Sequence, residues 1–305
     1  MAPRLALKID VDTLRGFREG VPVLRDLLDH RGLKASFFVA LGPDNSGRAL
    51  RRLFRQPGFL NKMWRTKAPA LYGFRTLLYG LLIPGPLIGR YAADLLPALA
   101  ASGHEVGLHG YDHVRWHDGL LKMSPQQLQQ EVQAAQTLFT AVMSQPARAF
   151  AAPGWQCSAA SKQILAAQGF LYASDTRGSG PFWPRFRDQL IPLLEIPTTL
   201  PTLDELLGFN GCRPRDFSRL ILKRLRPEAP QVLTIHAEVE GGPYRREFAW
   251  LLDQALERGV TFFRLRDWAL ELLAEPQNIP VARVRPGRLP GRAGTVACQT
   301  PQEAL

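Results

Sequence analysis

Short apolar segments alternate with longer amphipathic segments through most of the 305-residue chain, and this alternation constrains the fold most. The short segments have the length of buried strands, and the longer ones repeat apolar residues at helical spacing. Strands that alternate with helices form parallel sheets, either closed into a barrel or doubly wound. The predicted strands are Leu5–Ile9, Ala35–Ala40, Glu105–Leu108, Ala149–Ala152, Leu171–Ser174, Val232–Ile235 and Thr261–Arg264, and the predicted helices are Arg18–His30, Pro125–Met143, Ala159–Gln168 and Tyr244–Arg258.

Two segments interrupt this alternation and set the predicted domain boundaries. Residues 1–275 are predicted to form one α/β domain, with residues 48–93 as an insertion rich in basic and aromatic side chains. Residues 276–305 are rich in Pro, Gly and Arg, a composition typical of chains that cannot bury a core. We therefore expect this tail to be disordered.

The net charge of +11, from 38 Lys and Arg against 27 Asp and Glu, favours anionic partners such as phosphates or lipids. Charge alone does not choose between them. The three cysteines are far apart and odd in number, which argues against a disulfide framework or a Cys-x-x-Cys zinc site. The N-terminus runs straight into a strand without an apolar leader, so we expect no signal peptide and a cytosolic setting.

Polar residues follow three of the predicted strands. Asp10 and Asp12 end the first strand, His109 and His113 follow another in "EVGLHGYDH", and His236 ends a third in "VLTIHAEVEG". The carboxyl ends of parallel strands share one face and hold the active site in such folds. These five side chains are therefore predicted to converge.

The spacing of these residues predicts a catalytic metal site. Asp10 and Asp12, two apart on a strand, point the same way, and His109 and His113, four apart, can present both imidazoles to one ion. Two histidines and one carboxylate leave positions open for water and substrate. Two close aspartates without a cation would repel each other, so one is expected to bind metal and the other to handle protons. A non-haem iron oxygenase uses the same ligand types but explains neither the second aspartate nor His236.

Several motifs resemble those of a known family. "KIDVDT", "HGYDH" and "LTIH" resemble the first, second and fifth motifs of the NodB-homology polysaccharide deacetylase superfamily. Within it, "IDVDTLRGFREGVP", "SDTRG", "IPTTLPTLDE" and "TIHAEVEG" resemble the branch of bacterial deformylases that act on undecaprenyl-phosphate 4-formamido-arabinose in lipid A modification and polymyxin resistance. The likeness covers residues 4–273. It implies a distorted (β/α) barrel of about seven strands that binds a divalent ion, usually Zn²⁺, with Mn²⁺, Co²⁺ or Fe²⁺ as alternatives.

The resemblance also implies a role for each strand-end residue. Asp12, His109 and His113 would be metal ligands, Asp10 the general base and His236 the general acid. Hydrolysis of the formamide would release formate and leave a 4-amino sugar. Two alternatives stay open: an N-deacetylase of another amino sugar or polysaccharide with the same site, and an inactive protein that binds the lipid carrier.

The sequence departs from the family at the third motif, which normally supplies an arginine that orients the base. In "FAAPGWQC", Ala151 stands at that position. We expect Asp175 and Arg177, in "YASDTRG", to replace this support by pairing with the Asp10 region or to bind substrate. The alternative is a loop salt bridge far from the metal.

Three further residues are candidates for substrate contact. Trp155, after Pro153 and Gly154, is expected to form a wall of the sugar pocket, unless it packs in the core. Glu238 and Glu240 are expected to hold the imidazole of His236 or to bind a sugar hydroxyl, unless they are solvated loop carboxylates.

The insertion predicts contact with a membrane surface. No acidic residue occurs between Asp44 and Asp94, and the apolar stretch "LLYGLLIPGPLIG" is interrupted by prolines and too short to span a bilayer. Cationic residues among aromatic and aliphatic ones are typical of an element that lies in the membrane interface. We expect peripheral association with the cytoplasmic face of the bacterial inner membrane, where a polyprenyl-linked sugar lies, and no nucleic acid partner. A soluble lid or dimer surface is the alternative.

Overall fold

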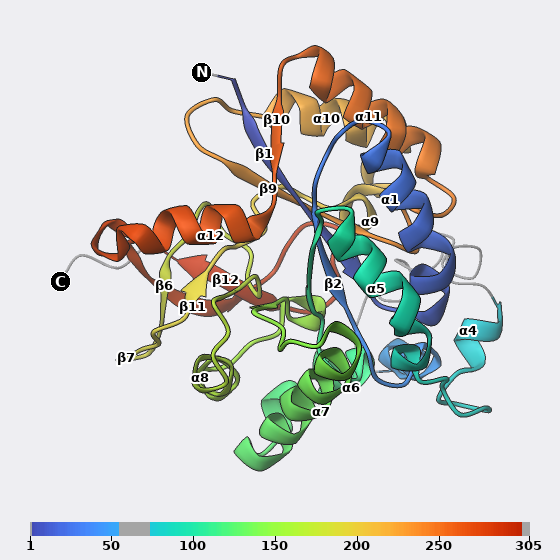
Figure 1. Ribbon diagram of the computed structural model, residues 1–305, viewed down its shortest axis with the longest axis vertical. Coiled ribbons are helices and arrows are strands. Elements are labelled where there is room, and N and C mark those ends of the chain that lie inside the picture. Colours follow the sequence, from blue (N-terminus) through green and yellow to red (C-terminus); the bar gives the residue numbers. More distant parts are fainter. Residues whose placement is uncertain (1, 55–73, 301–305) are drawn as a thin grey trace.

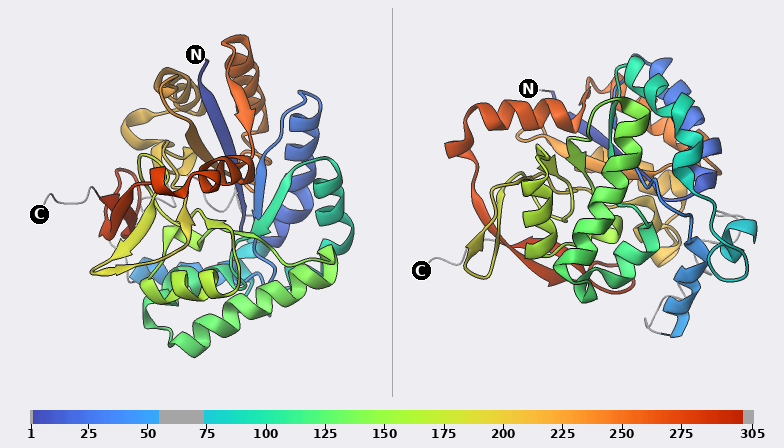
Figure 2. Two further views of the ribbon diagram at one scale, coloured as in Figure 1. Left: turned by 60° about the vertical axis from the view of Figure 1, so that its left-hand side comes forward. Right: turned by 60° about the horizontal axis from the view of Figure 1, so that its bottom comes forward.

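The computed structural model describes residues 2–54 and 74–300, and its main sheet has eight strands that pair only in parallel. The strand order is β10-β1-β2-β3-β4-β5-β8, with β9 also paired to β1. Helices surround the curled sheet (Figure 2), which confirms the expected distorted (β/α) barrel. The strands are β1 Arg4–Val11, β2 Ser36–Val39, β3 Glu105–Leu108, β4 Ala149–Phe150, β5 Tyr172–Ala173, β8 Leu194–Glu195, β9 Gln231–His236 and β10 Thr261–Phe263.

Strand β1 pairs with three other strands of the main sheet (Figure 1). It pairs with β10 at its start, with β2 along its second half and with β9 from Leu5 to Asp10. Every β1 residue after Arg4 is buried, because both faces of the strand are covered. The register with β9 sets Asp10 opposite His236, and this brings two of the predicted catalytic residues together.

The predicted helices form, with one change of geometry. The segment expected as Arg18–His30 begins with a π-helical turn, η1 Gly16–Gly20, and continues as the helix α1 Val21–Asp29. A Cβ at Gly16 would lie 2.1 Å from Glu238 Oε1, so the close approach requires glycine there. The other α-helices are α4 Phe74–Leu78, α5 Ala92–Ala101, α6 His113–Gly119, α7 Pro125–Met143, α8 Ala159–Ala167, α9 Leu203–Leu206, α10 Pro214–Arg224, α11 Arg245–Glu257 and α12 Leu265–Ala274.

The prediction of a disordered tail is wrong for residues 276–300. Strands β11 Val281–Gly287 and β12 Val296–Thr300 form a second sheet with β6 Trp183–Phe186 and β7 Gln189–Leu190. Val296 and Ala297 are buried, and Arg177 N donates to Ala297 O across 2.9 Å. Composition misled the prediction because the prolines and glycines are tolerated before, within and between two short strands, whose buried residues Ala282, Val296 and Ala297 pack against the domain.

The insertion lies only partly within the described residues. Its described parts include most of η2 Ser46–Phe54, α4, and η3 Ile88–Tyr91, while residues 55–73 lie outside them. Leu81, Leu82 and Ile83 expose their side chains, Leu82 to 79%. Among the described residues, no helix has the length and apolar character needed to span a bilayer.

Candidate metal centre and active site

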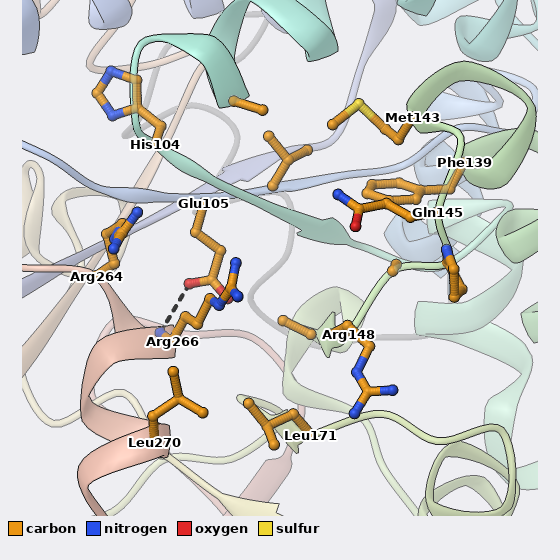
Figure 3. A pocket seen from close by; sticks show the side chains of 15 residues that line it. His104, Glu105, Phe139, Met143, Gln145, Arg148, Leu171, Arg264, Arg266 and Leu270 are labelled. Carbon is orange, nitrogen blue, oxygen red and sulfur yellow. Dashed lines mark hydrogen bonds between the residues drawn. The ribbon is translucent and has the colours of Figure 1, made fainter.

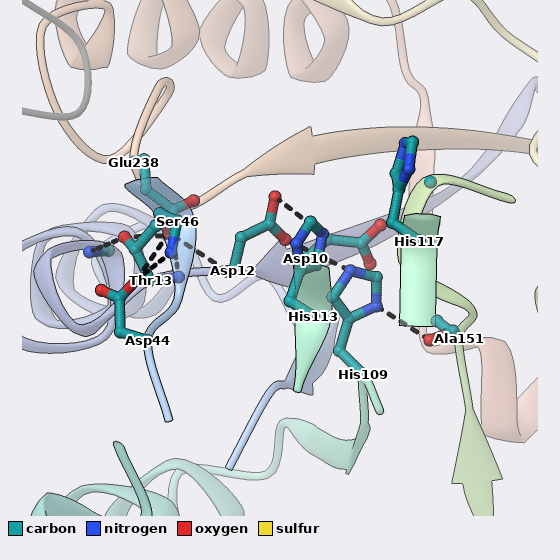
Figure 4. A network of polar contacts seen from close by, with 12 residues as sticks. Asp10, Asp12, Thr13, Asp44, Ser46, His109, His113, His117, Ala151 and Glu238 are labelled. Atoms are coloured by element: carbon teal, nitrogen blue, oxygen red, sulfur yellow. Dashed lines mark hydrogen bonds and ion pairs between the residues drawn. The ribbon is translucent and has the colours of Figure 1, made fainter. Parts of the chain in front are cut away.

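Asp12, His109 and His113 form the one cluster of potential metal ligands in the described ranges. Asp12 directly follows β1, His109 directly follows β3, and His113 is the first residue of α6. Their ligand atoms all lie within 4.8 Å of one another, with 3.2 Å between His109 Nε2 and Asp12 Oδ1 and 3.4 Å between His113 Nε2 and Asp12 Oδ2 (Figure 4). The predicted ligand set therefore converges.

The hydrogen bond of His109 fixes which atoms face the centre. His109 Nδ1 lies 2.8 Å from the carbonyl oxygen of Ala151, which can only accept, so Nδ1 carries the proton. A neutral His109 then points the lone pair of Nε2 at Asp12 Oδ1, a buried atom without a hydrogen-bond partner in the described structure. Two acceptors that face each other at this distance repel, and a cation between them removes the repulsion. The residues present fit a divalent metal.

The electrostatics of the cluster agree with this fit. Burial alone would raise the pKa of Asp12, but His113 and His109 outweigh it and hold that pKa well below its usual range. Burial lowers the pKa of His113 to about 4. At neutral pH the cluster therefore presents a carboxylate and an unprotonated imidazole, the forms that bind metal.

Asp10, the predicted base, pairs with a lysine that the sequence analysis did not identify. Lys8 Nζ lies 2.6 Å from Asp10 Oδ2, and both side chains are buried. Asp10 Oδ1 has no hydrogen-bond partner among the described residues. The signal was in the sequence, because Lys8, Asp10 and Asp12 alternate along one strand and so share a face.

Lys8 provides the positive charge that Ala151 cannot. The expectation that Asp175 or Arg177 pairs with the Asp10 region is wrong. Asp175 is fully buried and lies 2.7 Å from Lys162, whereas Arg177 pairs with Glu205. These two belong to neighbouring ion pairs within the domain, and their contact with substrate stays a prediction.

His236, the predicted acid, is the last residue of β9. Burial alone would lower the pKa of His236, but the carboxylates of Asp204, Asp12, Glu240 and Asp10 outweigh it and raise that pKa. A raised pKa keeps more of the imidazole protonated at neutral pH, which suits a proton donor.

Glu238 and Glu240 accept hydrogen bonds from backbone N–H groups. They do not hold the imidazole of His236, which was one of the two expected roles. Glu238 Oε1 accepts hydrogen bonds from Asp12 N at 2.9 Å and from Thr13 N and Oγ1 at 2.7 Å. Glu240 Oε2 accepts from His236 N at 2.9 Å. Burial raises the pKa of Glu238 to about 8 and that of Glu240 to about 7. Glu238 thus fixes the turn that carries the ligand Asp12 (Figure 4).

Trp155 is buried with cations on its ring. Lys8, Arg177 and Arg292 lie 5.3, 5.1 and 4.5 Å from the ring centroid, and the indole nitrogen donates to Thr198 Oγ1 at 3.1 Å. The ring therefore packs against the lysine that holds Asp10. Its expected contact with a sugar stays a prediction.

The fold and this site define a class of protein. The sequence family described as polysaccharide deacetylase matches residues 3–173, more than half of the chain. The chain therefore belongs to the polysaccharide deacetylase family, which comprises amide hydrolases, and the resemblance of its motifs to that family is confirmed.

Two relatives make the comparison more specific. The chain is 38% identical over 297 residues to a protein of Shewanella sediminis named probable 4-deoxy-4-formamido-L-arabinose-phosphoundecaprenol deformylase ArnD. The match covers 97% of this chain and 94% of that protein. A protein of Wigglesworthia glossinidia brevipalpis with the same name is 34% identical, over 93% of this chain and 98% of its own. Among solved structures, one called a probable polysaccharide deacetylase from Pseudomonas aeruginosa has a TM-score of 0.61 at 18% identity, covering 90% of this chain and 92% of that one. This structure supports the fold alone.

Proposed function

We propose that the chain is a metal-dependent deformylase that hydrolyses the formamide of undecaprenyl-phosphate 4-deoxy-4-formamido-L-arabinose. The products are formate and the 4-amino sugar lipid used to modify lipid A in polymyxin resistance. The observation that carries the metal-hydrolase part is the pair of facing acceptors, His109 Nε2 and Asp12 Oδ1, beside a base with one unused oxygen. The substrate is taken from the two relatives named as such deformylases.

Asp12, His109 and His113 would hold the ion, which we propose to be Zn²⁺. When bound, such an ion polarises an amide carbonyl and makes a bound water more acidic. Ala151 contributes by its carbonyl oxygen, which holds His109 in the tautomer that binds metal.

The proton transfers fall to the side chains beside the ligands. Asp10 Oδ1 accepts a proton from the attacking water, while Lys8 donates to Oδ2 and holds the carboxylate in place. His236 donates a proton to the nitrogen of the leaving amine as the C–N bond breaks. Water thus supplies the hydroxyl of formate, and the amine leaves with the added proton.

Membrane contact is the remaining part of the proposal. The catalytic domain, residues 1–275 together with the paired tail, would meet the cytoplasmic face of the inner membrane through the insertion 48–93. Exposed Leu81, Leu82 and Ile83 lie in this insertion, together with Arg48 and Arg90. Apolar groups beside cations favour an anionic bilayer surface. The substrate headgroup stays at that surface because its polyprenyl chain stays in the bilayer.

The test compares two acyl groups on one lipid-linked sugar. Purified, zinc-loaded protein is incubated in detergent with undecaprenyl-phosphate 4-formamido-arabinose or with its acetamido counterpart, and formate and acetate are measured. The proposal predicts formate release and far slower acetate release. Faster acetate release would favour an N-deacetylase, and binding of both lipids with no release would favour an inactive carrier-binding protein.

A further inference from the structure

A cavity of about 700 Å³ lies beside the metal centre and is lined by an excess of basic side chains. The helix α6 and the turn that follows it form one side, Arg48 and Arg52 of η2 another, and residues 288–295 of the paired tail a third. Five of the lining residues are cationic, Arg48, Arg52, Arg115, Lys122 and Arg288, and one is acidic, Asp118. The tail that composition marked as disordered thus contributes to this cavity.

Carboxylates pair with two of these five cations. Arg52 lies 2.7 Å from Asp118, and Arg115 lies 2.6 Å from Glu131. Within the described ranges, Lys122 and Arg288 have no carboxylate partner. Guanidinium and ammonium groups around an open space favour an anion, and guanidinium groups match the geometry of phosphate oxygens.

The helix α6 connects this cavity to the metal centre. It begins at the ligand His113 and presents His117 to the cavity one turn later. The ring centroids of His113 and His117 are 6.3 Å apart, so the lining of the cavity begins one helical turn from a predicted metal ligand (Figure 4). A sugar held at the metal would thus extend past His117 toward the cavity.

We propose that this cationic cavity binds the phosphate of the substrate, and this inference rests on the proposed function. In a 4-amido sugar joined to phosphate at carbon 1, the amide and the phosphate lie at opposite ends of one pyranose ring. A substrate with its amide at the metal can thus place its phosphodiester among Lys122, Arg288 and the neighbouring arginines. The cavity would then select sugar phosphates over sugars that lack the charge.

The test uses two soluble substrates that differ only in this charge: the methyl phosphodiester of 4-formamido-arabinose and its methyl glycoside. Formate release is measured for the native protein and for Lys122→Gln/Arg288→Gln. We expect the native preference for the phosphodiester, as a ratio of kcat/KM values, to fall about tenfold or more in the variant. The control, Lys223→Gln/Arg224→Gln on the exposed end of α10, removes the same charge elsewhere and should keep the ratio.

Other outcomes would overturn the inference. An equal ratio in both proteins would show that the cavity does not recognise phosphate. A ratio that stays the same while binding to phosphatidylglycerol vesicles falls would assign the cavity to bilayer headgroups instead. If the native protein released no formate from either substrate, the proposed function would fail, and calorimetric binding of methyl phosphate to the two proteins would still decide whether the cavity is a phosphate site.

Discussion

Two polar clusters lie at opposite ends of strand β3, and both contain histidine and carboxylate side chains. His104 lies directly before the strand and His109 directly after it. At the amino end, Glu105 has both oxygens occupied: Oε1 accepts from Tyr172 at 2.8 Å, and Oε2 accepts from Ser36 at 2.5 Å and from Arg266 N at 3.0 Å. Figure 3 shows the contact with Arg266.

At the carboxyl end of the sheet, the buried oxygens are incompletely used. Asp10 Oδ1 and Asp12 Oδ1 have no hydrogen-bond partner in the described part of the chain. Buried polar atoms are nearly always paired, so those left over indicate a ligand or a reaction. The comparison teaches that residue type does not separate structure from catalysis in this sheet, whereas the use of the carboxylate oxygens does: both oxygens of Glu105 accept hydrogen bonds, and one oxygen each of Asp10 and Asp12 has none among the described residues.

The largest expected effect is loss of a metal ligand at the carboxyl end. Asp12→Ala removes the carboxylate between two imidazoles and should lower formate release at least about 1000-fold, or about 4 kcal/mol, because metal binding is lost. Zinc content by mass spectrometry and formate release are measured together. The exposed Asp26→Ala is the control, and a variant that kept both zinc and activity would remove Asp12 from the site.

Lys8→Met should have the next largest effect. Without the ammonium group, the buried Asp10 is left unpaired and favours its protonated form, so the base is lost and kcat should fall about 100-fold. Lys8→Arg keeps the charge and should recover much of kcat, while zinc content stays native in both variants. Activity of Lys8→Met within twofold of the native protein would show that Asp10 does not need this partner.

Glu105→Ala tests the polar cluster at the amino end of strand β3. It leaves the hydroxyls of Tyr172 and Ser36 buried without their acceptor, and the free energy of unfolding should fall by about 2 kcal/mol. Activity per folded molecule should not change, because Glu105 lies at the other end of β3 from the ligands. Urea unfolding and formate release separate the two effects, and a stable but inactive variant would contradict the division between the ends.

The smallest expected effect is the contribution of His104 to the pH dependence of the free energy of unfolding. Its Nδ1 accepts from Ala35 N at 3.2 Å, and burial lowers its pKa below 6.5. The unfolded chain therefore binds this proton more readily than the folded one, so stability is lost as pH falls below 6.5 toward the folded pKa. Relative to His104→Asn, which does not titrate, the native protein should lose unfolding free energy between pH 7.5 and 5.0. An equal pH dependence in both would show that His104 does not contribute.

The sequence predicted the parts of the fold that depend on local pattern. The strand Glu105–Leu108 and the helix Pro125–Met143 have the predicted bounds, because apolar runs and their spacing are local signals. The strand-end rule also brought Asp12, His109 and His113 together from distant positions.

The missed features depend on long-range contacts. Lys8 stands in an apolar run; its spacing of two from Asp10 predicts a shared strand face, but the ion pair between them appears only in the structure. The tail strands β11 and β12 are stabilised by β6 and by the loop at Arg177, so composition could not predict them. Glu238 was expected near His236, but a turn of the chain brings it to Asp12 and Thr13.

Metal titration of the stripped protein tests the central claim most directly. The native protein is freed of metal with a chelator, and formate release from the lipid-linked formamido sugar is followed as zinc is added in steps. The account predicts almost no release without metal and a linear rise that ends at one zinc per chain. Undiminished release by the stripped protein, or saturation that is unchanged in Asp12→Ala, would contradict the assignment of Asp12, His109 and His113 as the metal centre.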